Sequence, residues 1–304
     1  MRALRLLCES DNLNFETALT SYKNEGKRAM TELVENTVME QLFLALHHLS
    51  ALEKMADVEK NSDYARLGIL AWYYGITNAA SAMTAAKDGS FQEDHSGTAR
   101  MWDTAIASKN LAMGPFGWRV TSLIETILKG EVATYRGQSS GDLLNKPKDA
   151  GEARGAAAGY LSGSAGWYAW KNTEDVRNSK AFKQLGTDNF RTKAARELRD
   201  EKLGTKTMCF LHQASRYRGK ANYREALFLA YGTSTNSILG GFIADQALVL
   251  KAFLSMAGAF CSRKLGSKLW EDFLKDVEES KAFSTSAIGI WSKPPAAPPK
   301  STAQ

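Results

Sequence analysis

The sequence predicts an all-α protein from three observations. Only Pro115 and Pro147 interrupt the first 290 of its 304 residues, and proline is the residue that most strongly breaks helices. Alanine, leucine, lysine and glutamate, which favour helices, are abundant. Apolar residues recur at helical spacing, as with Leu42, Leu46 and Leu49. Hydrophobic residues make up 44% of the chain and charged residues 24%, which is typical of a globular protein with a sizeable core.

The first half of the chain divides into helical stretches and short breaks. Residues 14–60 predict one long helix or a pair, and residues 63–87 predict a central helix, because this alanine-rich stretch is apolar nearly all round. The sequence DGSFQEDHSG, residues 88–97, predicts a loop that carries His95. Residues 98–113 predict a helix, and residues 118–130 a short amphipathic one.

A stretch rich in Gly and Ser, residues 136–175, predicts an insertion or connection between helical blocks. Gly151, Gly155, Gly159 and Gly163 recur every four residues, and on a helix this stripe would let another backbone approach closely. A phosphate-binding loop is disfavoured, because no Lys-Ser or Lys-Thr follows at the required spacing and no strand-like run precedes it.

The second half of the chain predicts a basic helix at 189–204, an apolar helix at 238–261 and an amphipathic helix at 265–280. Asp245 and Lys251 near the middle of the apolar stretch favour a buried core helix over a membrane span.

The chain as a whole is therefore expected to have four parts. They are an N-terminal helical part (1–135), a Gly-rich and then basic insertion (136–206), a C-terminal helical part (207–290) and a disordered Pro-rich tail (291–304). The N-terminal apolar run is too short for a signal peptide, and three scattered cysteines imply no disulfide framework. We therefore expect a cytoplasmic protein.

The positive charge is concentrated in one segment. The chain has a net charge of +6, yet residues 177–224 hold thirteen Lys/Arg and four Asp/Glu, a net of +9. Such a segment indicates an anionic partner, either nucleic acid (RNA or DNA) or an acidic protein, although a solvated helical surface has the same pattern. The candidate contacts are Arg191, Lys193, Arg196, Arg199, Arg216, Arg218, Lys220 and Arg224.

Signatures of catalysis and of metal binding are scarce. The sequence contains no HExxH, GxSxG or P-loop motif. Cys209 and His212 have a spacing that suits zinc but lack a second pair of ligands nearby, so we expect neither metal nor cofactor. His95, beside Asp94, is a candidate base or a residue that hydrogen-bonds at a helix start.

Two separated stretches resemble the HEPN superfamily (higher-eukaryote and prokaryote nucleotide-binding domains). In the first, an aromatic pair is followed by alanines at helical spacing and by a His with a small residue, here Tyr73, Tyr74, Ala79, Ala82, His95 and Gly97. The second, Arg218-Gly-Lys-Ala-Asn-Tyr223, is similar to an Arg-x-x-Ala-Asp-Tyr element of the same branch, with Asn222 in place of Asp.

The resemblance implies a helical bundle, often dimeric, of the kind that works in bacterial toxin–antitoxin, anti-phage defence or RNA-processing systems. Its ribonuclease members use an Arg followed, after four to six residues, by His. This chain lacks that pattern, and Lys206, six residues before His212, is no substitute for a forked guanidinium. An atypical metal-independent ribonuclease site would use His95 and Arg218.

Three functions therefore remain open from the sequence. We favour a non-catalytic binding or scaffold subunit of a multi-component bacterial system that engages nucleic acid or an acidic protein through its basic segment. The alternatives are an atypical HEPN-like ribonuclease and a purely structural oligomer subunit with the glycine stripe as its seam.

Overall fold

The computed structural model describes residues 1–222, 239 and 241–292, and these residues confirm the all-α class. They contain thirteen α-helices, and the only β-pairing within this part of the chain is an isolated bridge between Val120 and Met208. The α-helices are α1 (Arg2–Ser10), α2 (Phe15–Ser21), α3 (Glu32–Ala56), α4 (Ala65–Asp88), α5 (His95–Ala105), α6 (Glu125–Arg136), α7 (Ala150–Asn178), α8 (Lys180–Gln184), α9 (Lys193–Gly204), α10 (Phe210–Asn222), α13 (Phe242–Leu265), α14 (Ser267–Ser280) and α15 (Ala287–Trp291). Short 3-10 helices lie at η1 (Asn61–Tyr64), η2 (Ala107–Lys109) and η3 (Gly114–Gly117).

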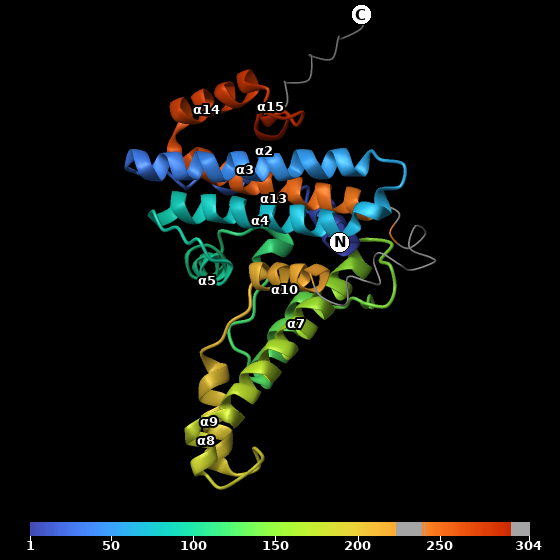
Figure 1. Cartoon of the computed structure of the whole chain (residues 1–304), viewed down its shortest axis with the longest axis vertical. Helices are drawn as coiled ribbons and strands as arrows, with labels where there is room; N and C mark the ends of the chain where they lie inside the picture. The colour runs from blue at the N-terminus through green and yellow to red at the C-terminus, as the bar shows by residue number, and fades with distance from the viewer. Residues whose placement is uncertain (223–238, 240, 293–304) are drawn as a thin grey trace, which may run out of the picture.

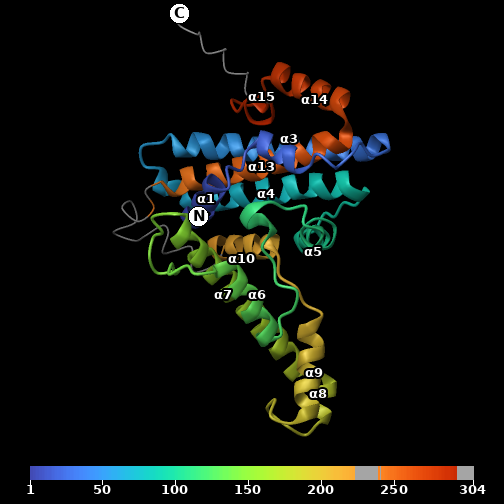
Figure 2. The ribbon, with the colours of Figure 1, turned by 180° about the vertical axis from the view of Figure 1, so that it is seen from behind.

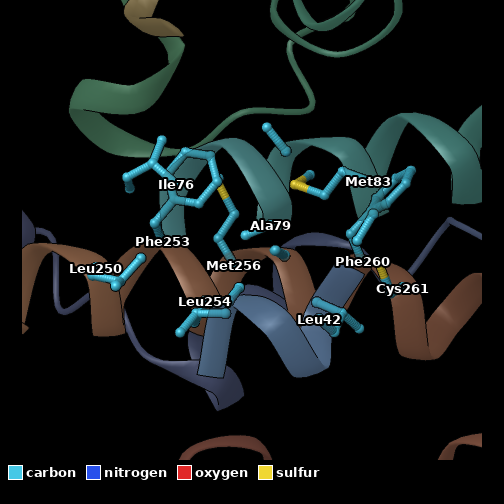
Figure 3. Close-up of a cluster of buried hydrophobic side chains, with 14 of the residues drawn as sticks. Leu42, Ile76, Ala79, Met83, Leu250, Phe253, Leu254, Met256, Phe260 and Cys261 are labelled. Atoms are coloured by element: carbon cyan, nitrogen blue, oxygen red, sulfur yellow. The ribbon is translucent and has the colours of Figure 1, made fainter. Parts of the chain in front are cut away.

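We call the part of the protein that shares the main apolar core the body; it contains α1 to α5, α10 and α13 to α15. Three long helices, α3, α4 and α13, pack against one another at its centre (Figure 1). Their facing sides supply the core, where Leu42 of α3, Ile76 of α4 and Phe253 of α13 are fully buried (Figure 3). The central helix expected at 63–87 is confirmed as α4, and most of its residues are buried. Glycine and alanine on α4 allow this close packing, because a Cβ at Gly75 would lie 2.6 Å from Leu250 Cδ2.

Helix α13 corresponds to the apolar stretch of the sequence. By length and composition it alone among the described helices could cross a membrane, but 78% of its most apolar window is buried inside the protein. Asp245 near its start is buried and accepts a hydrogen bond from Arg5 at 2.9 Å. This burial agrees with the expected core helix.

An arm, made of α6 to α9, projects from one side of the body, while α14 and α15 cover the opposite side (Figures 1 and 2). The arm has its own apolar clusters, one centred on Leu161 of α7 and Leu128 of α6 and a smaller one at the tip around Phe182. Two connecting segments join arm and body, and they pair where Val120 N donates to Met208 O at 2.8 Å. Arg119 next to that pair forms a two-point ion pair with the buried Asp103 (2.8 and 3.1 Å).

The Gly-rich stretch is more regular than a connection, because most of it belongs to the 29-residue helix α7. Asp149 caps this helix by accepting a hydrogen bond from Glu152 N at 2.9 Å. Gly155 and Gly159 of the glycine stripe face the chain's own preceding loop: Gly155 N donates to Ser139 Oγ at 2.9 Å, and a Cβ at Gly155 would collide with Gly141 O. At Gly155 the close backbone approach is therefore made within one chain.

Three further expectations need correction. His95 lies in the first turn of α5 rather than in a loop, because Asp94 caps this helix by accepting a hydrogen bond from Gly97 N at 2.7 Å. Residues 118–124, expected to begin a helix, precede α6, because the bridge at Val120 holds this segment against Met208. The expected disordered tail, 291–304, begins too early, because Trp291 ends α15 and is buried in the core, where its indole donates to Leu254 O at 2.8 Å. Residues from Lys293 onward lie outside the described residues.

The environment of α7 predicts opposite effects for two glycine substitutions. Gly155→Ala should lower the free energy of unfolding by about 1–3 kcal/mol, because its methyl group meets backbone that cannot move away easily. Gly163→Ala should raise it by up to about 1 kcal/mol, because Gly163 has open space around its Cβ position and alanine favours helices. Urea unfolding followed by circular dichroism measures both, and equal effects would contradict the packing described for the stripe.

Candidate functional site

Tyr73 of α4 brings together the two residues that the sequence offers as a catalytic pair. The ring of His95, from α5, meets the Tyr73 ring edge-on with centroids 5.2 Å apart. The guanidinium carbon of Arg218, from α10, lies 4.8 Å from the same ring centroid. Residues more than a hundred positions apart in the sequence are thus held on one buried tyrosine.

His95 also contacts the next aromatic residue of α4. Its ring lies 5.5 Å from that of Tyr74, which in turn stacks on His48 of α3 at 5.9 Å. We call these five residues the tyrosine–histidine site: His48, Tyr73, Tyr74, His95 and Arg218. The site joins α3, α4, α5 and α10, so its geometry depends on the packing of the body.

The environment of the site favours neutral histidines. Burial lowers the pKa of His95, and the positive charge of Arg218 lowers it further, while Asp94 opposes the shift. Burial is also the main cause that lowers the pKa of His48. A neutral, partly exposed imidazole such as His95 can accept a proton. Arg218 has no ion-pair partner within the described part of the chain.

Cys209 and His212 lie close together but do not form an active nucleophile. Cys209 Sγ lies 3.2 Å from His212 Nδ1. Complete burial raises the pKa of this thiol to about 12, so it stays protonated near neutral pH. No cluster of three metal-ligating side chains occurs among the described residues, so the pair also lacks a third ligand.

The structure divides the basic segment into two groups. Arg191, Lys193 and Arg196 are exposed at the tip of the arm, whereas Arg216 and Arg218 lie in α10 beside the body (Figure 1). Arg216 contacts Trp167, and eleven residues of α7, about 17 Å, separate Trp167 from the end of that helix at Asn178. The two groups therefore lie at different heights along the C-terminal half of α7.

Several of these cations already contact neighbouring groups. Lys193 lies 3.7 Å from Glu197, and Arg196 donates to the backbone oxygen of Arg191. Arg199 pairs with Asp200 at 2.8 Å. The side chain of Lys220 and the whole of Arg224 lie outside the described residues.

Two exposed tryptophans are functional candidates that the sequence reasoning missed. Trp167 and Trp170 of α7 are 43% and 59% exposed and lie on one helical face, because they are three residues apart. The guanidinium carbon of Arg216 lies 4.4 Å from the Trp167 ring centroid, and the amine of Lys171 lies 5.8 Å from it. The sequence GWYAWK carries a signal for this face, but only once its stretch is recognised as helical.

We call these four residues the tryptophan face: Trp167, Trp170, Lys171 and Arg216. It combines flat apolar rings with cations at the surface. Cations over an indole ring are attracted by its negative face, which holds Arg216 and Lys171 beside the exposed rings.

No protein-family model, curated protein or solved structure matches this chain.

The tyrosine–histidine site makes a specific prediction about proton binding. Arg218→Gln should raise the pKa of His95 towards the ordinary histidine value, because it removes a positive charge that disfavours the protonated ring. An NMR titration of the histidine ring carbons measures this change, and His48 and His212 serve as internal references. Arg216→Gln is the matched control, since Arg216 faces Trp167 instead. A His95 pKa that responds equally to both substitutions would contradict the contact with Arg218.

Proposed function

We propose that the chain binds single-stranded nucleic acid along the arm, through the tryptophan face. The observation that carries the proposal is the pair of exposed indoles with two cations on or beside Trp167. Bases of any sequence stack on aromatic rings, and lysine and arginine neutralise the phosphates between them. The four side chains provide both kinds of contact within two turns of α7 and the middle of the adjoining helix α10.

Exposed tryptophans favour a binding role over a merely solvated helix. Tryptophan buries a large apolar surface when it is covered, and here two of them point away from the apolar clusters of the arm. Neither residue belongs to those clusters, so the fold of the arm does not require an indole at either position. Cations alone would not distinguish a binding surface from a solvated helix, because both carry them.

The cations at the tip extend this surface. Arg177, Arg191, Lys193 and Arg196 are exposed between the tryptophan face and the end of the arm, although Arg177 pairs with Glu174 and Lys193 lies 3.7 Å from Glu197. A flexible strand can follow these cations along the arm. The exposed indoles, on which bases stack, are the reason to prefer nucleic acid over an acidic partner protein.

A second candidate function, an atypical ribonuclease, is favoured by the tyrosine–histidine site. It holds an imidazole whose pKa is lowered and a guanidinium on the same tyrosine ring. A base of this kind removes a proton from an attacking hydroxyl, and a guanidinium stabilises the charge that develops on phosphate. The wider role, as a subunit of a bacterial defence or toxin–antitoxin system, is part of the proposal and depends on the HEPN resemblance.

Single-stranded binding predicts a distinct mutational pattern. Trp167→Ala and Trp170→Ala should each weaken binding of fluorescently labelled oligouridine or oligothymidine by about 5- to 100-fold, as expected for the loss of one stacked base. Wild-type affinity should fall steeply as salt is raised, because bound counterions are released from the phosphates. Fluorescence anisotropy measures both effects. Lys275→Ala is the matched charge control, because Lys275 is exposed on α14, across the body from the arm.

The outcomes separate the candidate functions. Binding that is independent of salt, or equal in the tryptophan variants and the Lys275→Ala control, would overturn the proposed function. The same mixtures on a denaturing gel test cleavage, which His95→Ala and Arg218→Ala should abolish if the ribonuclease candidate is right. A chain that retains only an acidic protein from a pull-down, and no oligonucleotide, would favour the protein partner.

A further inference from the structure

A cavity of about 240 Å³ lies where the arm meets the body. Its walls come from the start of α1, from Trp72 of α4, from the loop at 142–147, and from α7 and α10. Five aromatic rings line it, and several of them meet edge to face, as Tyr160 of α7 does with Tyr217 of α10 at 6.0 Å. Flat aromatic guests pack against such rings in offset-stacked or edge-to-face geometry.

One polar side chain in this wall lacks a hydrogen-bond partner. Gln213 of α10 is 8% exposed, and its side-chain amide makes no hydrogen bond in the described part of the chain. Both polar atoms of this amide remain open to water, whereas those of the unpaired Gln246 amide are sealed off. The residues of α10 that line the cavity, Phe210, Gln213, Ala214 and Tyr217, share one face of the helix, because they lie three, four and seven positions apart. The side chain of Gln213 therefore leaves α10 on the side of the cavity.

The opening and the size of the cavity limit what fits. Leu143, Asn145 and Lys146 of the loop line the cavity and are themselves exposed, so the cavity opens to solvent along this loop. An apolar cavity of roughly 150 Å³ holds one benzene ring, so 240 Å³ suits two fused rings. A flat bicyclic group that belongs to a longer molecule can therefore enter from the side of the loop.

The amide of Gln213 distinguishes between flat bicyclic groups by its hydrogen bonds. It presents an acceptor, Oε1, beside the two donors of Nε2. Adenine carries the complementary pair, its N6 amino group and N7, and glutamine binds this edge with two hydrogen bonds. Guanine has two acceptors, O6 and N7, on the same edge, which would leave Oε1 without a donor. Proteins that read single strands hold bases in this way, stacked on aromatic side chains with their edges hydrogen-bonded.

The cavity and the tryptophan face lie next to each other on the same two helices. Tyr160 and Trp167 are seven residues apart, so they share one side of α7 and lie about 10 Å apart along it. Gln213 and Arg216 are three residues apart on α10, and Arg216 lies over the Trp167 ring. Roughly three nucleotides cover this distance at about 3.4 Å each, the rise of one strand in a stacked helix. A strand bound on the tryptophan face can therefore bring one base to the cavity.

We infer that the cavity takes up one adenine base of the single strand bound on the tryptophan face, and that Gln213 selects this base. The inference rests on the proposed function and adds a sequence preference at one position of the strand. Stacking on Trp167 and Trp170 tolerates every base, because every base has a π-face. Selection of one base therefore requires the edge contacts that the cavity provides.

The test compares labelled strands that differ at one base. Oligouridine with a single central adenosine should bind the wild-type chain about 5- to 150-fold more tightly than plain oligouridine, the discrimination of one bidentate pair. A third strand carries purine riboside in place of the adenosine. Purine riboside keeps the two rings but lacks the 6-amino group, so it should lose most of the advantage. Fluorescence anisotropy at constant salt measures all three affinities.

Two variants assign the preference to the cavity. Gln213→Leu keeps a side chain of similar volume but removes the amide, so it should bind the adenosine and purine riboside strands equally, with unchanged affinity for oligouridine. Gln184→Leu, at an exposed glutamine of α8, is the matched control. Ala157→Phe should fill the cavity and give equal affinity for all three strands. Circular dichroism checks that each variant folds, and the comparison of strands on the wild-type chain does not depend on any variant.

The outcomes separate this inference from the proposed function. Equal binding of all three strands, or a preference for adenosine that survives in Gln213→Leu, would refute the inference and leave the proposed function intact. If none of the strands binds, both fail. Isothermal titration with free adenosine identifies the source of the base. Saturable binding that Gln213→Leu removes, in a chain without preference among the strands, would assign the cavity to a free adenine compound instead.

Discussion

The enclosure of α4 by its neighbours is the constraint on which the rest of the structure depends. Consecutive residues on a helix point about 100° apart, so Trp72, Tyr73 and Tyr74 face three different directions. Because α3, α5, α10 and α13 surround the helix, the three rings reach different sets of neighbours, although Tyr73 and Tyr74 share His95. Trp72 lines the cavity, Tyr73 carries His95 and Arg218, and Tyr74 stacks on His48. Small residues make this enclosure possible, since a Cβ at Gly68 would lie 2.6 Å from the Oε1 of the buried Gln246.

The body could be predicted further than the arm, for a physical reason. The helices that become α4, α13 and α14 have apolar patterns that follow from burial within the body, and those patterns are visible in the sequence. Helix α7 shows no comparable apolar pattern in the sequence. Its glycines lower helix propensity, and its closest backbone contact, with Gly141, exists only once the chain is folded. Without α7 as a helix, Trp167 and Trp170 have no common face, so the tryptophan face could not be found from the sequence.

The candidate sites, too, could be predicted only in part from the sequence. The sequence placed His95 and Arg218 in one hypothesis, and the structure brings both to Tyr73. It also predicted one continuous basic segment, whereas α9 carries its cations near the tip of the arm and α10 places Arg216 on Trp167, within α7. Proximity along the chain does not imply proximity in space once a long helix lies between two segments. Asp94 was an available signal for a helix start at His95, because a capping aspartate is a local feature.

Helix α10 contributes to both the tryptophan face and the tyrosine–histidine site. Arg216 and Arg218 are two residues apart, so they leave the helix on roughly opposite sides, one towards Trp167 of the arm and the other towards Tyr73 of the body. Tyr217 between them lines the cavity. An anion bound beside Arg218 would offset the charge that lowers the pKa of His95, and His95 would then bind a proton more readily. By thermodynamic linkage, protonation of His95 would strengthen binding of that anion by the same factor. Any anion that bound beside Arg218 would therefore be coupled to the charge of the tyrosine–histidine site through this single side chain.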